Sequence, residues 1–200
     1  MQNNTHSEKE ILIYNAVTKL IKNGVKLHSV KVADIAKAAG IGKGTIYDYF
    51  TSKEEILSKA LLYYMDNEIK EVLERLESVE GFKNKFYIIL DMAEGNVNDN
   101  NSITELLLSN LGIEYVKELL ENDMKELEAS EKILKENILE LVKVGVEEGI
   151  INDQEDDEYA KTVLMSVVIG FCNYACCNKG RSSLELQKER AYKLLIKGLN

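Results

Sequence analysis

The chain contains no proline in 200 residues, and this absence constrains its fold more than any other single feature. Average usage of ~5% would give about ten prolines. Because proline lacks a backbone donor and breaks helix interiors, a chain without it can form long uninterrupted helices. With 45% apolar and 30% charged residues, the composition is that of a folded chain, and the length suits one large domain or two small ones. We therefore expect long helices and no proline-rich linker.

Apolar residues recur at spacings of three and four along most of the chain, which is typical of amphipathic helices. Ser7 is the predicted N-cap of the first helix, Thr51 and Ser52 cap the fourth, and Gly40 ends the second. Ser130 is the candidate break in the longest helical pattern. No hairpin signal is present, so the predicted fold class is all-α. We expect about nine helices, with approximate bounds 8–23, 32–39, 43–50, 53–78, 82–96, 102–110, 113–148, 156–177 and 183–199.

One segment, residues 31–53, has the pattern of two short helices joined by a tight turn at residues 40–42. Its apolar positions, such as Ile46 and Phe50, can pack against a core. The same spacing leaves Lys43, Tyr47 and Tyr49 available on the outside. A helix–turn–helix uses this arrangement, because its second helix enters the major groove of DNA.

The segment resembles the TetR family of bacterial transcriptional repressors. The matching residues are Asp34-Ile35-Ala36, Ala39-Gly40-Ile41, Gly44-Thr45-Ile46-Tyr47, Tyr49-Phe50 and Lys53. The resemblance covers about residues 7–60 and implies that these side chains contact DNA: Lys31, Lys43, Gly44, Thr45, Tyr47, Tyr49 and Lys53. Two positions depart from the family pattern, because Lys31 stands where the family often has Thr and Gly42 where it commonly has Ser. Either Lys31 contacts phosphate as a point charge, or Ser29 caps the second helix instead.

The same resemblance implies a three-helix DNA-binding domain over residues 1–52 and a helical effector-binding and dimerisation domain over 53–200. It also implies a small, hydrophobic effector and a homodimer that binds a palindromic double-stranded operator. Among helically spaced aromatic and Met residues, and with one Asn, the pocket candidates are Tyr64, Tyr87, Met92, Tyr115 and Asn173. The apolar faces of the last two helices supply the interface candidates Val163, Val167, Gly170, Phe171, Tyr174 and Leu195.

The net charge of −9 argues against nucleic-acid binding only while the chain is taken as a whole. Residues 1–53 hold eight lysines and four acidic residues, a net charge of +4. Residues 54–200 hold 17 basic and 30 acidic residues, a net charge of −13. The positive charge therefore coincides with the helix–turn–helix segment, as phosphate binding requires.

Two other classes of protein compete with this interpretation, an enzyme and a helical interaction module without a DNA-binding role. No glycine-rich phosphate loop or HExxH motif occurs, and both histidines precede residue 30. Cys172, Cys176 and Cys177 favour packing in a core or interface, with thiol sensing as the alternative. We expect no metal, no cofactor and no membrane-spanning segment. The polar N-terminus and the clustered cysteines favour a cytoplasmic protein.

Overall fold

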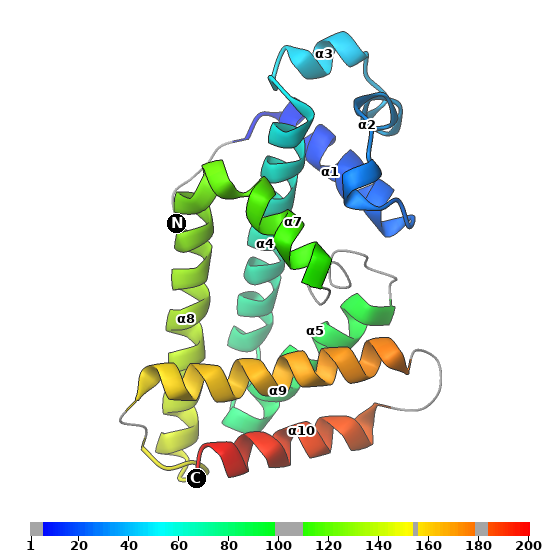
Figure 1. Ribbon diagram of the computed structural model, residues 1–200. Coiled ribbons are helices and arrows are strands. Elements are labelled where there is room, and N and C mark those ends of the chain that lie inside the picture. The colour runs from blue at the N-terminus through cyan, green and yellow to red at the C-terminus, as the bar shows by residue number, and fades with distance from the viewer. Residues whose placement is uncertain (1–5, 99–109, 154–155, 179–183) are drawn as a thin grey trace. The chain divides into compact units, whose positions relative to one another are not determined.

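The computed structural model describes residues 6–98, 110–153, 156–178 and 184–200, and within them it is all-helical (Figure 1). The chain divides into two compact units, residues 1–67 with 100–127, and residues 68–99 with 128–200. The first unit is built from α1 (Glu8–Lys22), η1 (Leu27–Ser29), α2 (Val32–Ala39), α3 (Lys43–Tyr47), the start of α4 (Lys53–Glu77), α7 (Asn110–Leu119) and η2 (Glu121–Asp123). The second contains the rest of α4, α5 (Phe82–Asn98), most of α8 (Met124–Glu147), α9 (Asp157–Cys177) and α10 (Glu185–Gly198).

The described part of the chain holds nine α-helices, and most of their bounds agree with the helical periodicity. Two predictions differ: α3 ends at Tyr47 and not at residue 50, and the pattern over 113–148 forms two helices, α7 and α8, the first of which already begins at Asn110. The predicted helix over 102–110 lies almost wholly outside the described residues, as does the start of the one predicted at 183. The predicted break at Ser130 is wrong, because Ser130 is buried inside α8. The break instead lies at η2, where the run from Glu121 to Asp123 supplies turn-forming side chains.

Local caps set the helix ends in the first unit. Ser7 and Glu10 form a capping box, in which the Glu10 amide donates to Ser7 Oγ at 3.3 Å and the Ser7 amide donates to the Glu10 carboxylate at 2.7 Å. The Glu55 amide donates to Ser52 Oγ at 3.0 Å. Gly40 ends α2 with φ of 68°, a left-handed conformation that glycine adopts without strain. These ends were predicted and are confirmed.

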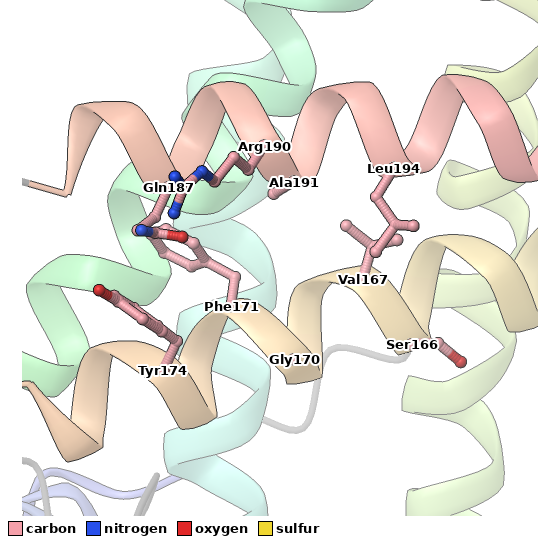
Figure 2. A pocket seen from close by; sticks show the side chains of 9 residues that line it. All are labelled: Ser166, Val167, Gly170, Phe171, Tyr174, Gln187, Arg190, Ala191 and Leu194. Carbon is pink, nitrogen blue, oxygen red and sulfur yellow. The ribbon is translucent and has the colours of Figure 1, made fainter.

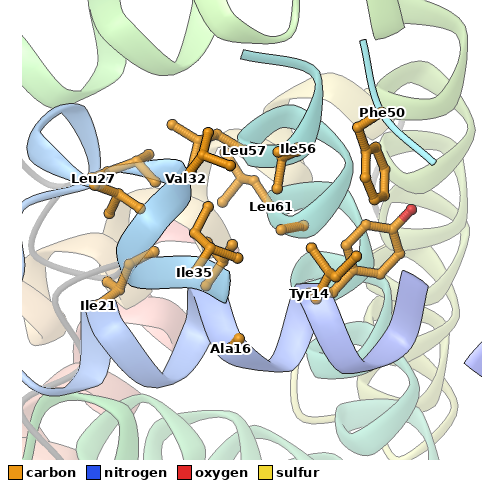
Figure 3. Close-up of a cluster of buried hydrophobic side chains, with 14 of the residues drawn as sticks. Tyr14, Ala16, Ile21, Leu27, Val32, Ile35, Phe50, Ile56, Leu57 and Leu61 are labelled. Carbon is orange, nitrogen blue, oxygen red and sulfur yellow. The ribbon is translucent and has the colours of Figure 1, made fainter. Parts of the chain in front are cut away.

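The core of the first unit joins the helix–turn–helix to the start of α4 (Figure 3). Ile35 of α2, Ile46 of α3 and Ile56 of α4 are each fully buried in it. The Tyr14 ring lies 5.8 Å from the Phe50 ring, which closes the end of the core beside α3. Side chains of α7, together with Leu120 just after it, also belong to this core, so packing divides the chain elsewhere than at residue 52. The functional boundary at residue 52 stays a prediction.

The second unit packs α5 against α9 and α10. Phe82, Phe86 and Leu90 line up on the buried face of α5. Close approach is possible at Gly145, where an added Cβ would lie 2.8 Å from the Phe82 ring. The Glu148 carboxylate accepts from the Phe82 amide at 3.1 Å and so satisfies a free donor at the start of α5.

Candidate functional site

The outer surface of the helix–turn–helix carries lysine and tyrosine side chains. Tyr47 is 49% exposed and Tyr49 is 41% exposed. Lys43 Nζ lies 5.8 Å from the centroid of the Tyr47 ring, within the range of a cation–π contact. On the opposite side of the same segment, Ile46 and Phe50 are buried. The burial of these two residues leaves Lys43, Tyr47 and Tyr49 facing solvent, and all three are predicted to contact DNA.

The backbone at the start of α3 is open to close approach. Gly44 is exposed, and a Cβ added there would meet no atom within 4 Å. Gly42 is the N-cap residue in an extended conformation and makes no side-chain cap. Thr45 is half-buried beside it. At Gly44 no side chain would keep the backbone of α3 away from the wall of a DNA groove.

The start of α2 answers one alternative left by the sequence. Lys31 is the exposed N-cap residue of α2, and no side chain caps this helix. The Ser29 hydroxyl donates to the Lys26 carbonyl at 2.7 Å, within its own turn. Ser29 therefore does not replace the missing cap, and the Lys31 ammonium stands at the surface where a phosphate can reach it.

Lys53 has a structural contact that the sequence did not indicate. Its Nζ donates to the His28 carbonyl at 3.2 Å and so ties the start of α4 to η1. The His28 ring in turn meets the Tyr115 ring of α7 edge-on, with centroids 6.4 Å apart. The first contact spans 25 positions of the sequence and the second spans 87. Helical periodicity alone cannot predict contacts over such separations.

The five pocket candidates belong to both units. Tyr64 and Tyr115 are half-buried against the core of the first unit. Met92 is buried and Tyr87 half-buried in the second. Asn173 is exposed and donates to the Ile169 carbonyl of its own helix at 3.1 Å. These residues remain candidates for an effector site.

An open groove of about 300 Å³ lies between α9 and α10 in the second unit (Figure 2). Val167 of α9 and Leu194 of α10 point toward each other across it, while Gln187 and Arg190 lie near Phe171. The helical spacing of residues 187, 190 and 194 places them on one face of α10. That spacing is the signal by which the sequence could have nominated them.

The six interface candidates differ in accessibility. Gly170 and Tyr174 are exposed, and Val163 is half-buried. Val167 and Phe171 are buried yet still line the groove. Leu195 is fully buried in the core of the second unit, whereas the neighbouring Leu194 is 59% exposed.

The exposed apolar face of this region extends beyond the groove. Ile169 of α9 is 45% exposed and Leu186 of α10 is 55% exposed. By length and composition alone, α9 is also apolar enough to cross a membrane, although the sequence led us to expect no such segment. Only 33% of the apolar stretch is buried inside the chain. The helix is therefore apolar on its core face and on a second face that the described residues leave exposed.

The cysteines differ in environment along α9. Cys172 is buried, and burial raises the pKa of its thiol to about 11. Cys176 is half-buried and Cys177 is exposed. A thiol with a raised pKa is a poor nucleophile, so Cys172 is a packing residue. Among the described residues, no group of three His, Cys, Asp or Glu side chains could hold a metal ion.

Comparisons with known proteins bear on both units. The model of the family "Bacterial regulatory proteins, tetR family" matches residues 26–61. The chain is 25% identical to a fatty acid metabolism regulator protein of Bacillus subtilis (strain 168) over 192 residues, 94% of each chain. It is also 26% identical over 92 residues to the dhaKLM operon transcriptional activator DhaS of Lactococcus lactis, covering 44% of this chain and 47% of that protein.

Solved structures share the fold over nearly the whole length. FadR from Bacillus subtilis, in complex with stearoyl-CoA, superposes with a TM-score of 0.70 at 23% identity, over 95% of this chain and 99% of that one. A TetR transcription regulator from Haloarcula marismortui superposes with a TM-score of 0.72 at 17% identity, over 98% and 100%. The chain therefore shares its arrangement of helices with these two solved structures.

Proposed function

We propose that this chain, a transcriptional regulator of the TetR family with an N-terminal DNA-binding helix–turn–helix, is a repressor that binds a palindromic operator as a homodimer. We further propose that a long-chain acyl-CoA binds the second unit and releases the operator. The regulator acts in the cytoplasm, where it has access to DNA.

One observation carries the DNA-binding proposal: α3 buries Ile46 and exposes Tyr47. The exposed side also holds Lys43, so aromatic hydroxyl and ammonium donors face outward together. Phosphate contacts from such donors position a protein on DNA, and contacts to base edges give sequence selectivity. The N-terminal net charge of +4 supports the same proposal.

The uncovered face of α9 and α10 supports the homodimer. Tyr174 and Leu194 are exposed beside the groove, with Arg190 as a polar group among them. A second copy of the chain would cover the same residues on both subunits, because a two-fold interface uses one patch twice. Two readers related by a two-fold axis then require two half-sites, which makes the operator a palindrome. The dimer also accounts for the apolar character of α9 without a membrane.

The effector proposal rests on the relatives. The relative that aligns over 94% of the chain is a regulator of fatty acid metabolism, and a solved structure of the same fold holds stearoyl-CoA. An acyl chain suits a mostly apolar pocket with a few polar groups. We propose Tyr87 and Met92 as part of its lining, since both lie on α5 in the second unit. The effector lowers operator affinity only if it binds the non-binding conformation more tightly.

DNA binding can be tested without knowing the operator sequence. A duplex is selected from a random library by the wild-type protein, and its dissociation constant is measured by fluorescence anisotropy at several salt concentrations. We expect the affinity to fall by about three orders of magnitude between about 50 and 200 mM salt. Failure to enrich any duplex would contradict the proposal and leave a helical interaction module as the better account.

A further inference from the structure

Two continuous helices, α4 and α8, run from the first unit into the second. Inside the first unit a polar network of Ser58, Lys59, Asp123 and Glu126 joins α4 to η2 and to the first turn of α8. Lys59 Nζ donates to Asp123 Oδ1 at 2.7 Å and to Glu126 Oε2 at 2.9 Å. The Ser58 hydroxyl donates to the other Asp123 oxygen. Residues 64 to 67 positions apart in sequence are thus held together by charge-assisted bonds.

The network is shielded from solvent more than a surface ion pair. Ser58 is 2% exposed, and the side chain of Asp123 is 14% exposed. Burial opposes ionisation of Asp123, but hydrogen bonds from Lys59 and Ser58 outweigh it and hold the pKa of the carboxyl below its ordinary value. Burial likewise opposes the charge on Lys59, but the hydrogen bonds that its ammonium donates to Asp123 and Glu126 outweigh burial and raise the pKa of Lys59. Both groups are therefore charged near neutral pH, and removing one leaves its partner in a poorly solvated place.

The position of the network suggests more than stability. On α4 it lies next to Ile56 and Leu57, which are fully buried against the helix–turn–helix. On the other side it holds η2 and the first turn of α8. A movement of α4 or α8 can therefore be passed through this network to the residues that support the recognition helix.

We propose that Ser58, Lys59 and Asp123 are positioning residues that couple effector binding to operator affinity. This inference rests on the proposed function, because it requires an effector and an operator. The network touches neither ligand directly. It makes α4 and the start of α8 move together. A shift of one helix then changes the position of the recognition helix α3, because the two helices cannot slide past each other at the network.

The test compares Lys59→Met with wild type by measuring three quantities: operator affinity, stearoyl-CoA affinity by calorimetry, and operator affinity in saturating stearoyl-CoA. In wild type we expect stearoyl-CoA to weaken operator binding by about tenfold or more, as is typical of allosteric coupling. In Lys59→Met we expect that factor to fall to within about twofold of unity, while stearoyl-CoA binds with an affinity within about threefold of wild type. If the network had only a structural role, Lys59→Met would weaken the binding of both operator and stearoyl-CoA. The factor by which stearoyl-CoA weakens operator binding would then stay at its wild-type value.

Two further variants serve as controls. Lys59→Arg keeps the charge and the donors, so the coupling should be retained. Lys135→Met removes the same kind of side chain from an exposed ion pair with Glu158 in the second unit, and it too should keep the coupling. A Lys59→Met protein with wild-type coupling overturns the inference. A wild-type protein that binds DNA and ignores stearoyl-CoA overturns the effector proposal, and this inference with it.

Hydrogen exchange of the free protein gives a readout that needs no ligand. In Lys59→Met we expect faster exchange of the amides of α7 and η2 than in wild type, and wild-type exchange in α9. Unchanged exchange across residues 110–127 would show that the network does not hold this segment and would also overturn the inference.

Discussion

Both units expose large apolar side chains, but the neighbours of those side chains differ. In the first unit Tyr47 and Tyr49 share their surface with Lys43. In the second unit Tyr174 and Leu194 are exposed beside a groove that is lined mostly by apolar residues, with Arg190 and Gln187 among them. Aromatic hydroxyls beside lysines suit a polyanion, whereas a mostly apolar surface suits a protein partner. Exposure alone therefore does not identify a partner; the charge around the exposed residue does.

The largest expected effect comes from removing an aromatic ring from either core. It tests whether the buried aromatic side chains stabilise both units. Phe86→Ala empties a fully buried position in the second core, and Phe50→Ala a 3% exposed position in the first. Each should lower the free energy of unfolding by ~3–5 kcal/mol, measured by urea denaturation. A loss below ~1 kcal/mol at either position would contradict the packing described for that unit.

A charge placed on the apolar face of the second unit should weaken dimerisation. Leu194→Glu places a carboxylate in the proposed dimer interface, so we expect the dimer dissociation constant to rise by about a hundredfold, an effect of ~2.7 kcal/mol. Light scattering after size exclusion measures it, with wild type near twice the chain mass of 22.6 kDa. Leu134→Glu, at a 37% exposed position on α8, is the matched control and should stay dimeric. A dimeric Leu194→Glu protein would remove this face from the interface.

The tyrosine surface of the first unit should lose operator affinity without losing stability. Tyr47→Ala removes an exposed ring and hydroxyl, and we expect about tenfold weaker operator binding by anisotropy, or ~1.4 kcal/mol. The free energy of unfolding should change by less than ~0.5 kcal/mol. Tyr159→Ala removes a tyrosine of similar exposure, 51%, from the second unit and should leave operator affinity unchanged. Equal affinities of Tyr47→Ala and wild type would refute the assignment of α3.

A smaller effect is expected from Asp123→Asn, and it depends on pH. The pKa of Asp123 is lowered in the folded protein, so ionisation of this group stabilises the fold above its unfolded pKa of about 4. That contribution is lost as the pH falls through the folded pKa. Asp123→Asn should therefore lower the free energy of unfolding by ~1 kcal/mol or more near pH 7. The difference from wild type should shrink below about pH 4, and a difference independent of pH would contradict this role for the carboxylate.

The first unit was more predictable from sequence than the second because its signals are local. Gly40 needs a left-handed turn, and Ser52 with Glu55 caps the next helix within four residues. The burial of Ile46 follows from the spacing of a few apolar residues. Each of these features is decided by residues close together in the chain, so a single sequence suffices to predict them.

The second unit shows where such reasoning stops. Leu194 and Leu195 are equally apolar neighbours, and only the packing of α10 buries one and exposes the other. α9 is apolar on two faces, so periodicity could not separate its core face from its uncovered face. The pairing of Ser58 with Asp123 spans 65 residues, and neither residue carries a motif. Contacts of this kind depend on the tertiary fold.

The most direct test of effector control is a titration of the wild-type protein–operator complex with stearoyl-CoA, followed by anisotropy of the labelled duplex. Free coenzyme A serves as the control for the polar part of the molecule. We predict that stearoyl-CoA releases the duplex and weakens its binding by about tenfold or more, while coenzyme A alone does not. Anisotropy that stays unchanged at saturating stearoyl-CoA would contradict the claim that an acyl-CoA in the second unit controls DNA binding by the first.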